Sequence, residues 1–455
     1  MGGIFKAYDI RGIYPNQLDS ELIFNIGRAY AEILKKKLSK DKITIVVGKD
    51  MRLSSPELSE SLKKGITTQG VDVIDIGLSS TPTFYYAVSF LGADGGMQVS
   101  ASHNPKEYNG VKIVGEKAYP VGYDTGINTI EEMALAGEFP ESQKEGAVEN
   151  KEGILDSEVE FALKHGKPDA IKKMKIVCDT ANAMGSPYLE KLFGNLSCEL
   201  VKMNFELDGT FPAHLADPFQ EENVADLKKR VLDENADLGI ATDGDGDRIF
   251  FIDDKGSFVE PAIIRGILAE IMLKENPGAK VCYDIRPGKI TRDMIEQNGG
   301  TPVVTRVGHS LIKQKAIEEG AVFAGESSGH FFFNYSEIGV FEMPMIVVLK
   351  LLEYVSEKGK PFSEIIAPLR KYSHSGEINF KVENKQEVMD KVKESYPDAK
   401  ISDLDGITIE YDSWWFNIRA SNTEPLLRLN LEANDENIMK EKVSEVKELI
   451  DKFSS

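Results

Sequence analysis

The chain has 455 residues, more than a single hydrophobic core usually serves, so several domains are expected. Its 41% hydrophobic and 28% charged residues are typical of a globular protein and exclude a disordered or fibrous chain. The formal net charge of -20 repels nucleic acid and anionic membrane surfaces, so neither is expected as a partner.

The N-terminus and the cysteines indicate a cytoplasmic protein. Residues 1–11 carry charge and glycine where a secretory signal needs an apolar stretch. The longest apolar run, residues 343–355, is broken by Lys350 and Glu353 and is too short to span a bilayer. The three cysteines lack a C-x-x-C spacing, which argues against a disulfide framework and against a zinc site.

A pattern of strand, Asp-containing turn, helix and strand occurs three times in chain order. Such strand-helix-strand units predict α/β sheets with parallel strands. The paired strands are expected at 43–47 and 71–76, at 176–178 and 198–201, and at 281–283 and 302–305, with helices that begin at Ser55, Ser186 and Lys289.

Each copy continues with a helix, a turn, a short apolar strand and a distinctive loop. The three loops are residues 100–105 (SASHNP), 243–248 (DGDGDR) and 325–330 (GESSGH). Because ligand sites in open α/β sheets lie beyond the carboxyl ends of the strands, the three loops are expected to converge on one cleft.

The last part of the chain, from about Lys371, breaks this pattern and predicts a smaller α+β domain. Residues 419–425 (RASNTEP) bring a guanidinium, hydroxyls and an amide together, and Arg428 follows closely, which is the donor set that a phosphate requires. Strands are expected at 375–382, 407–411 and 414–418, and an amphipathic helix at 436–453.

Three carboxylates alternate with glycine at Asp243, Asp245 and Asp247, and glycine lets them turn toward one hard cation. A calcium-hand loop shares this start, but Arg248 stands where that loop needs glycine, and Asp254 stands where it needs a bidentate Glu. A haloacid-dehalogenase-type phosphatase expects Thr or Val in place of Asp247. The pattern therefore favours a different oxygen-ligated metal site.

Ser102 lies between a predicted strand and the turn-forming pair Asn104 and Pro105, so its hydroxyl is expected to be exposed at a loop tip. A hydrolase triad is disfavoured, because His103 is the chain neighbour and the nucleophile-elbow sequence G-x-S-x-G is absent.

The third loop offers groups suited to a sugar phosphate. Glu326 and Ser328 can hydrogen-bond to vicinal hydroxyls, and His330 can meet a phosphate or exchange a proton. Further cationic or proton-transferring groups are expected at loop positions after apolar strands, at Arg11, Lys112 and His309.

Together these segments resemble the alpha-D-phosphohexomutases, specifically the phosphomannomutase/phosphoglucomutase branch of bacteria and archaea. The matching segments are 6–12, 100–112, 243–248, 306–310, 325–330 and 419–428. The resemblance implies an α/β fold of three topologically similar α/β domains plus a smaller C-terminal α+β domain around a central cleft. The expected domains are 1–145 with the phosphoserine loop, 146–252 with the metal site, 253–368 with the sugar loop, and 369–455 with the phosphate loop.

The resemblance also implies a role for each site residue. Ser102 resembles a phosphorylated catalytic serine, whose phosphate joins Asp243, Asp245 and Asp247 in binding Mg²⁺. Roles in phosphoryl and proton transfer are implied for Arg11, Lys112, His309 and His330, and roles in substrate binding for Arg248, Glu326, Ser328, Arg419, Ser421, Asn422, Thr423 and Arg428.

The implied activity is the interconversion of hexose 1-phosphate and hexose 6-phosphate, of mannose and/or glucose, through the phosphoserine and a hexose 1,6-bisphosphate that turns end over end. Ser327 stands where close relatives often carry Met, which keeps a phosphoglucosamine mutase as an alternative, although Asn422 favours the mannose/glucose branch. A sugar phosphatase and a non-catalytic sugar-phosphate sensor are the alternatives from other classes. An intact Ser102 disfavours the sensor.

Overall fold

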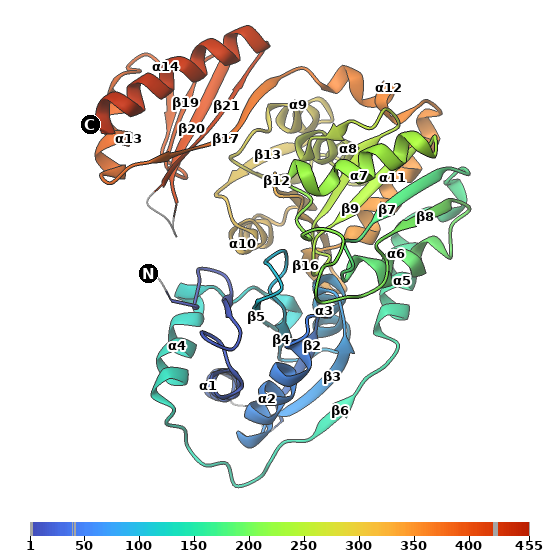
Figure 1. Cartoon of the computed structure of the whole chain (residues 1–455), viewed down its shortest axis with the longest axis vertical. Coiled ribbons are helices and arrows are strands. Elements are labelled where there is room, and N and C mark those ends of the chain that lie inside the picture. The colour runs from blue at the N-terminus through green and yellow to red at the C-terminus, as the bar shows by residue number, and fades with distance from the viewer. Residues whose placement is uncertain (1–2, 39, 41, 422–425, 455) are drawn as a thin grey trace. The chain divides into compact units, whose positions relative to one another are not determined.

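The computed structural model describes residues 3–38, 40, 42–421 and 426–454, and the chain divides into two compact units (Figure 1). The first unit contains residues 3–259 and 328–363, and the second unit contains residues 260–327 and 364–455. None of the described helices is long and apolar enough to cross a membrane.

The first repeat forms a six-stranded sheet with the order β1-β5-β4-β2-β3-β6. Helices α1, α2 and α4 share one buried apolar cluster with the strands, and α3 packs against β2 and β4. Helices α1 and α2 approach closely at Gly65, where a Cβ atom would lie 2.1 Å from the Phe24 carbonyl oxygen. The bounds are β1 (Ile10–Ile13), α1 (Ser20–Leu38), β2 (Thr44–Lys49), α2 (Ser55–Thr68), β3 (Asp72–Leu78), α3 (Thr81–Phe90), β4 (Gly95–Val99), β5 (Tyr108–Gly115), α4 (Ile127–Ala136) and β6 (Val148–Asn150).

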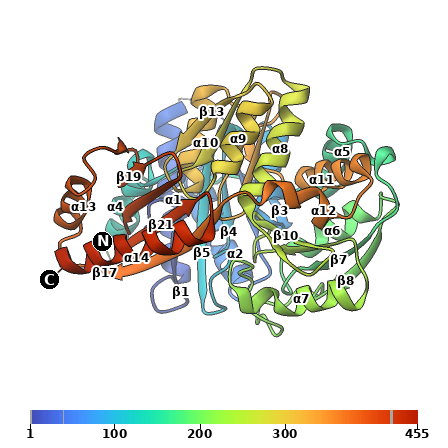
Figure 2. The ribbon, with the colours of Figure 1, turned by 90° about the horizontal axis from the view of Figure 1, so that it is seen from above.

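The second repeat forms a five-stranded sheet with the order β11-β10-β9-β7-β8. Helix α7 packs on one face of this sheet, and α5 and α6 lie on the other (Figure 2). The bounds are α5 (Ile154–His165), β7 (Lys175–Asp179), α6 (Gly185–Phe193), β8 (Glu199–Met203), α7 (Glu221–Asp233), β9 (Leu238–Thr242), β10 (Ile249–Asp253) and β11 (Phe258–Val259).

The third repeat is divided between the two units. In the second unit, β12 lies between β13 and β14 and is parallel to both. The bounds there are α8 (Pro261–Glu275), β12 (Lys280–Asp284), α9 (Lys289–Gln297), β13 (Thr301–Thr305), α10 (His309–Glu319) and β14 (Phe323–Gly325). The chain continues with the hairpin β15 (Phe331–Tyr335) and β16 (Gly339–Glu342), then α11 (Pro344–Lys358) and α12 (Phe362–Ile366). Short 3-10 helices lie at Glu116–Ala118, Tyr123–Thr125, Pro168–Ala170 and Ala367–Leu369.

The C-terminal part forms an antiparallel sheet with the order β17-β21-β20-β19-β18. Helices α13 and α14 share its apolar cluster, so one face of the sheet is covered by helices. The bounds are β17 (Ser373–Lys381), α13 (Lys385–Glu394), β18 (Lys400–Ser402), β19 (Ile407–Glu410), β20 (Trp414–Ala420), β21 (Leu426–Ala433) and α14 (Glu436–Ser454).

The three repeats that the sequence pattern predicted are present, and they share one strand order. The triplets β4-β2-β3, β9-β7-β8 and β14-β12-β13 are equivalent, and all their pairings are parallel. The predicted C-terminal strands and helix are confirmed with ends within two residues. The three distinctive loops therefore follow equivalent strands, β4, β9 and β14.

Candidate active site

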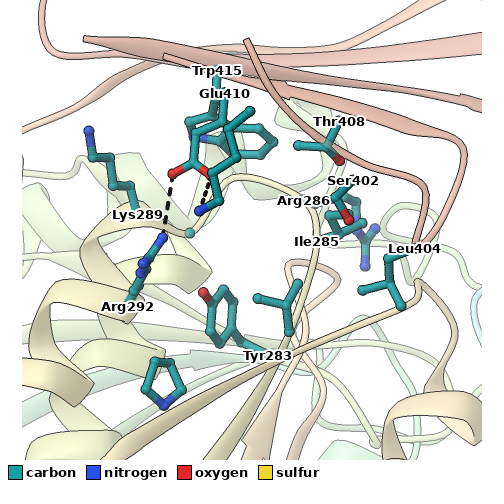
Figure 3. Close-up of a pocket in the computed structure, with 14 residues that line it drawn as sticks. Tyr283, Ile285, Arg286, Lys289, Arg292, Ser402, Leu404, Thr408, Glu410 and Trp415 are labelled. Carbon is teal, nitrogen blue, oxygen red and sulfur yellow. Dashed lines mark hydrogen bonds and ion pairs between the residues drawn. The ribbon is translucent and has the colours of Figure 1, made fainter. Parts of the chain in front are cut away.

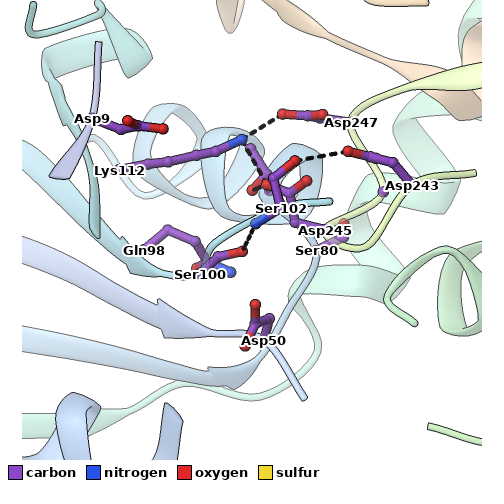
Figure 4. Close-up of polar contacts among 12 residues, drawn as sticks. Asp9, Asp50, Ser80, Gln98, Ser100, Ser102, Lys112, Asp243, Asp245 and Asp247 are labelled. Atoms are coloured by element: carbon purple, nitrogen blue, oxygen red, sulfur yellow. Dashed lines mark hydrogen bonds and ion pairs between the residues drawn. The ribbon is translucent and has the colours of Figure 1, made fainter. Parts of the chain in front are cut away.

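The Ser102 loop follows β4 and is covered by the loop of the second repeat. Ser102 has a left-handed φ of 49° and is only 3% exposed, so the expectation of an exposed loop tip was wrong. Its N–H donates to Ser100 Oγ at 3.0 Å, and its Oγ donates to Asp243 Oδ2 at 2.8 Å (Figure 4). The physical reason is Gly244, where a Cβ atom would lie 2.3 Å from the Ser102 carbonyl oxygen. Glycine therefore lets the two loops close over the serine.

Arg52 fixes the Ser102 loop through hydrogen bonds to its backbone. The sequence analysis assigned no role to this residue. Its guanidinium is buried, lies 3.2 Å from Asp50 Oδ2 and stacks 5.1 Å from the centre of the Phe211 ring. It donates to the carbonyl oxygens of Ser102 at 2.7 Å, Asn104 at 2.6 Å, Pro105 at 2.8 Å and Tyr108 at 3.0 Å. The sequence signal was available, because Asp50 and Arg52 occupy the Asp-containing turn of the first repeat.

The three carboxylates after β9 form one buried cluster with Lys112. Asp243, Asp245 and Asp247 are buried, and one oxygen of each lies within 4.8 Å of the others. Lys112 Nζ lies 2.6 Å from Asp245 Oδ2 and 2.5 Å from Asp247 Oδ2. Burial and the two neighbouring carboxylates raise the pKa of Asp243 well above its ordinary value. Burial alone would also raise the pKa of Asp247, but Lys112 and His330 overcome it and hold that pKa well below its ordinary value.

The cluster suits a hard divalent cation. Its donors are carboxylate oxygens with the Ser102 hydroxyl beside them, the oxygen set that Mg²⁺ prefers. Among the described residues, the buried Asp245 Oδ1 accepts no hydrogen bond, so it is available as a ligand atom. The other oxygen, Oδ2, accepts from Thr81 Oγ1 at 2.6 Å, and Thr81 N–H donates to the Asp245 carbonyl oxygen at 2.9 Å. Thr81 opens α3, and sequence reasoning did not identify it.

Two predicted groups lie at the edge of this cluster. Arg248 Nη2 lies 2.9 Å from His103 Nδ1, and the Arg248 charge, followed by burial, holds the pKa of His103 well below its ordinary value. His330 Nε2 lies 3.3 Å from Asp247 Oδ1, and its Nδ1 lies 2.9 Å from Ser328 Oγ. The end of the third loop thus meets the loop of residues 243–248.

Three of the predicted groups are not on loops, contrary to expectation. Arg11 lies in β1 and Lys112 in β5, while His309 is the first residue of α10. A strand position holds Arg11 against the Ser102 loop, where its Nη1 donates to Asn104 Oδ1 at 2.5 Å and its Nη2 pairs with Asp9.

The sugar loop is fixed by backbone and carboxylate contacts in the second unit. Buried Glu326 accepts from Gly308 N–H at 2.9 Å and lies 3.6 Å from Arg286 Nη2. Ser327 donates to Asp284 Oδ1 through its N–H at 3.2 Å and its Oγ at 3.0 Å. The Ser327 hydroxyl is therefore directed into the protein.

The phosphate loop begins at the end of β20. Arg419 Nη2 donates to Glu377 Oε2 at 2.6 Å, and Arg428 Nη1 lies 3.4 Å from Glu377 Oε1. Ser421 N–H donates to the Leu426 carbonyl oxygen at 2.8 Å. The predicted residues Asn422 and Thr423 lie outside the described residues.

The predicted site residues thus fall into two groups, one in each unit. The first unit holds Arg11, Ser102, Lys112, Asp243, Asp245, Asp247, Arg248, Ser328 and His330, and the second holds His309, Glu326, Arg419, Ser421 and Arg428.

Comparison with known proteins gives matches along nearly the whole chain. Four family descriptions match in order: phosphoglucomutase/phosphomannomutase alpha/beta/alpha domain I over residues 2–141, domain II over 157–256, domain III over 261–372, and the C-terminal domain over 377–449. A phosphomannomutase of Vibrio cholerae is 40% identical, with 99% of this chain and 98% of that protein covered. A phosphomannomutase of Methanocaldococcus jannaschii is also 40% identical, with the same coverage.

A solved structure agrees with these matches. The crystal structure of a phosphoglucomutase/phosphomannomutase family protein from Burkholderia thailandensis has a TM-score of 0.90 and 30% identity, and covers 100% of this chain and 99% of that one. The four domains in order, the three equivalent sheets and the full-length relatives lead to one conclusion: the chain belongs to the phosphoglucomutase/phosphomannomutase family of phosphohexomutases.

Proposed function

We propose that the chain interconverts hexose 1-phosphate and hexose 6-phosphate of mannose and/or glucose, with Ser102 as the phosphorylated residue and a hexose 1,6-bisphosphate as the intermediate. The observation that carries this proposal is the contact of Ser102 Oγ with Asp243 at 2.8 Å, inside a buried group of three carboxylates. A serine in that place has its phosphoryl group next to the ligands of a divalent cation.

Asp243, Asp245 and Asp247 would hold Mg²⁺, which supplies positive charge to the transferring phosphoryl group. In the first transfer, a hydroxyl oxygen of the hexose bonds to the phosphorus of phosphoserine 102, and the bond from phosphorus to Ser102 Oγ breaks. The proton of the sugar hydroxyl leaves to a basic group of the site, and the serine oxygen takes a proton from the site. Lys112 keeps positive charge beside the carboxylates during this exchange.

The return transfer needs the other phosphate of the bisphosphate at Ser102. The phosphate loop of the C-terminal domain would hold the distal phosphate in either orientation, through Arg419, Ser421 and Arg428 together with Asn422 and Thr423. Arg419 and Arg428 share the Glu377 carboxylate, which keeps both guanidinium groups on the same face of the sheet.

The sugar loop supports a substrate range that includes both epimers. Glu326 and Ser328 would bind hydroxyls that glucose and mannose share. The Ser327 hydroxyl is engaged by Asp284 at 3.0 Å, so it is not directed at the 2-position where the epimers differ.

A coupled assay of glucose, mannose and glucosamine phosphates, with magnesium and catalytic bisphosphate, tests the proposal. We expect kcat/KM for glucose 1-phosphate and mannose 1-phosphate to agree within about tenfold, or about 1.4 kcal/mol.

Ser102→Ala should lose at least about 10³-fold in kcat and lose its protein-bound phosphate, whereas Ser142→Ala, at an exposed loop, should retain both. A fully active Ser102→Ala variant would overturn the serine's role. Phosphate release that exceeds isomerisation would indicate a phosphatase, and faster turnover of glucosamine phosphate would indicate the other branch.

A further inference from the structure

A cavity of about 370 Å³ lies in the second unit, between the sheet of β12 and β13 and the C-terminal sheet (Figure 3). This volume falls within the range of about 300–1,000 Å³ that small-molecule sites occupy in proteins. None of the three carboxylates after β9 lines it. The cavity is therefore distinct from the carboxylate cluster.

The cavity is lined in part by apolar and aromatic side chains. Tyr283, Ile285, Leu404 and Trp415 line it, and Figure 3 shows the Tyr283 ring and the Leu404 side chain turned toward the open space. Burial raises the pKa of Tyr283 to about 12, so its hydroxyl stays neutral. The indole N–H of Trp415 already donates to Glu432 Oε2 at 2.8 Å, which leaves the ring carbons for contact with a ligand. Such walls suit a planar ring.

Other side chains of the lining carry charge. Arg292 Nη1 lies 3.4 Å from Glu410 Oε1, and Lys400 Nζ lies 3.2 Å from Glu410 Oε2, so one carboxylate is shared by two cations. Arg292 Nε also donates to Glu296 Oε1 at 3.0 Å. Lys289 Nζ donates to two neutral oxygens, Asp412 O at 3.1 Å and Asn434 Oδ1 at 3.4 Å. In a chain of net charge -20, this concentration of cations suits an anion.

We propose that this cavity binds a nucleoside phosphate, with the base against the apolar and aromatic side chains and the phosphates on Lys289, Arg292 and Lys400. A simple phosphate would make no use of the aromatic wall, and an uncharged ring would make no use of the cations. Glu410, which is already fixed between two cations, can accept hydrogen bonds from ribose hydroxyls.

The cavity is also connected to the sugar loop. Arg286 lines the cavity, and its Nη2 lies 3.6 Å from Glu326 Oε1. A ligand that contacts α9 and β19 together would fix the sheet that carries Glu326 relative to the sheet that carries Arg419. Bound nucleotide is therefore expected to change the KM for hexose phosphate. This effect rests on the proposed function, whereas the binding itself does not.

Calorimetric titration with ADP tests the binding directly. Saturating glucose 1,6-bisphosphate is present throughout, so that the phosphates of ADP cannot bind where the substrate phosphates bind. Adenosine and inorganic pyrophosphate are titrated separately. We expect ADP to bind at least tenfold more tightly than either. Equal affinities for ADP and pyrophosphate would show that the cavity binds anions without recognising the base, and would overturn the nucleotide proposal. Undetectable binding of ADP would also overturn it.

Matched variants locate the bound ADP. Arg292→Gln/Lys400→Gln should weaken ADP binding at least tenfold and abolish the effect of ADP on KM, with the basal KM and thermal midpoint retained. The control Lys391→Gln/Lys440→Gln removes the same charge from exposed helix pairs with Glu387 and Glu436, and should bind ADP like the parent protein. Unchanged affinity in the cavity variant would show that ADP binds elsewhere. Binding without any KM change would overturn the coupling and leave the binding intact.

Discussion

Two regions of the molecule use the same residue types with opposite access to water. In the carboxylate cluster, Lys112 is 6% exposed and lies 2.6 Å from Asp245, which is 0% exposed. In the cavity of the second unit, Lys400 is 73% exposed and lies 3.2 Å from Glu410, which is 36% exposed. Water can replace the partner of a charge in the second region but not in the first. Burial, rather than residue type, therefore decides how much each ion pair contributes to stability.

The largest effect is expected from Lys112→Met, which removes the cation and leaves buried carboxylates. Loss of one partner of a buried ion pair costs about 3–5 kcal/mol, so the free energy of unfolding in chelator should fall by about that amount. Urea unfolding measures it. Mg²⁺ should restore part of the loss, because the carboxylates regain a cation. The matched variant Lys400→Met should change by less than about 1 kcal/mol. Equal effects of the two variants would contradict the comparison.

Glu158 is a buried carboxylate whose partner is a neutral hydroxyl, in contrast to the buried carboxylates that are paired with Lys112. Thr83 Oγ1 donates to it at 2.6 Å, yet burial raises its pKa to about 7. Its ordinary pKa is about 4.3, so the folded protein binds more protons between these values, and stability falls as the pH rises from about 4.3 to about 7. The full loss of stability is about 4 kcal/mol above that window.

Glu158→Gln should remove this loss. At about pH 8 the variant should be more stable than the parent protein by up to about 4 kcal/mol, and near pH 4.5 the two should agree. Thermal or urea unfolding across this pH range measures the difference. Glu160→Gln, an exposed neighbour on α5, should show no such trend. A constant difference at all pH values would show that the pKa of Glu158 is not raised.

Arg52→Lys tests a buried cation whose partners are carbonyl oxygens. An ammonium cannot reproduce the planar fork that reaches the four carbonyls of the Ser102 loop. A displacement of the serine by about 1 Å can lower the reaction rate by about 10²-fold. We therefore expect kcat to fall by up to about that factor, with little change in KM. Arg230→Lys, at an exposed pair with Glu234, is the control. An equal rise in KM would indicate general disorder of the cleft and not loss of serine positioning.

Local sequence pattern predicted the repeats and their loops, because strand and helix periodicity and the glycines between Asp243 and Asp247 are local properties. The burial of Ser102 was not predictable in this way, because its cover is Gly244, which lies far along the chain. Likewise Lys112 reads as an ordinary polar residue, and only the pairing of β5 with β4 places it toward Asp245. Thr81 was missed for the same reason, since its partner Asp245 comes from another repeat. The turn that contains Asp50 and Arg52 was recognised, but the carbonyl oxygens that Arg52 reaches lie in the Ser102 loop and could not be inferred from that turn.

The smallest effect is expected from Glu410→Gln, which removes the carboxylate shared by Arg292 and Lys400. All three side chains are exposed by a third or more, so water takes over the lost contacts. The free energy of unfolding should fall by no more than about 1 kcal/mol at low salt. At about 1 M salt, where charges are screened within about 3 Å, the difference should disappear. Urea unfolding at the two salt concentrations measures it, with Glu436→Gln, the exposed partner of Lys440, as the control. A loss as large as that of Lys112→Met, and insensitive to salt, would mean that the cavity is closed to water and that its charges behave like those of the carboxylate cluster.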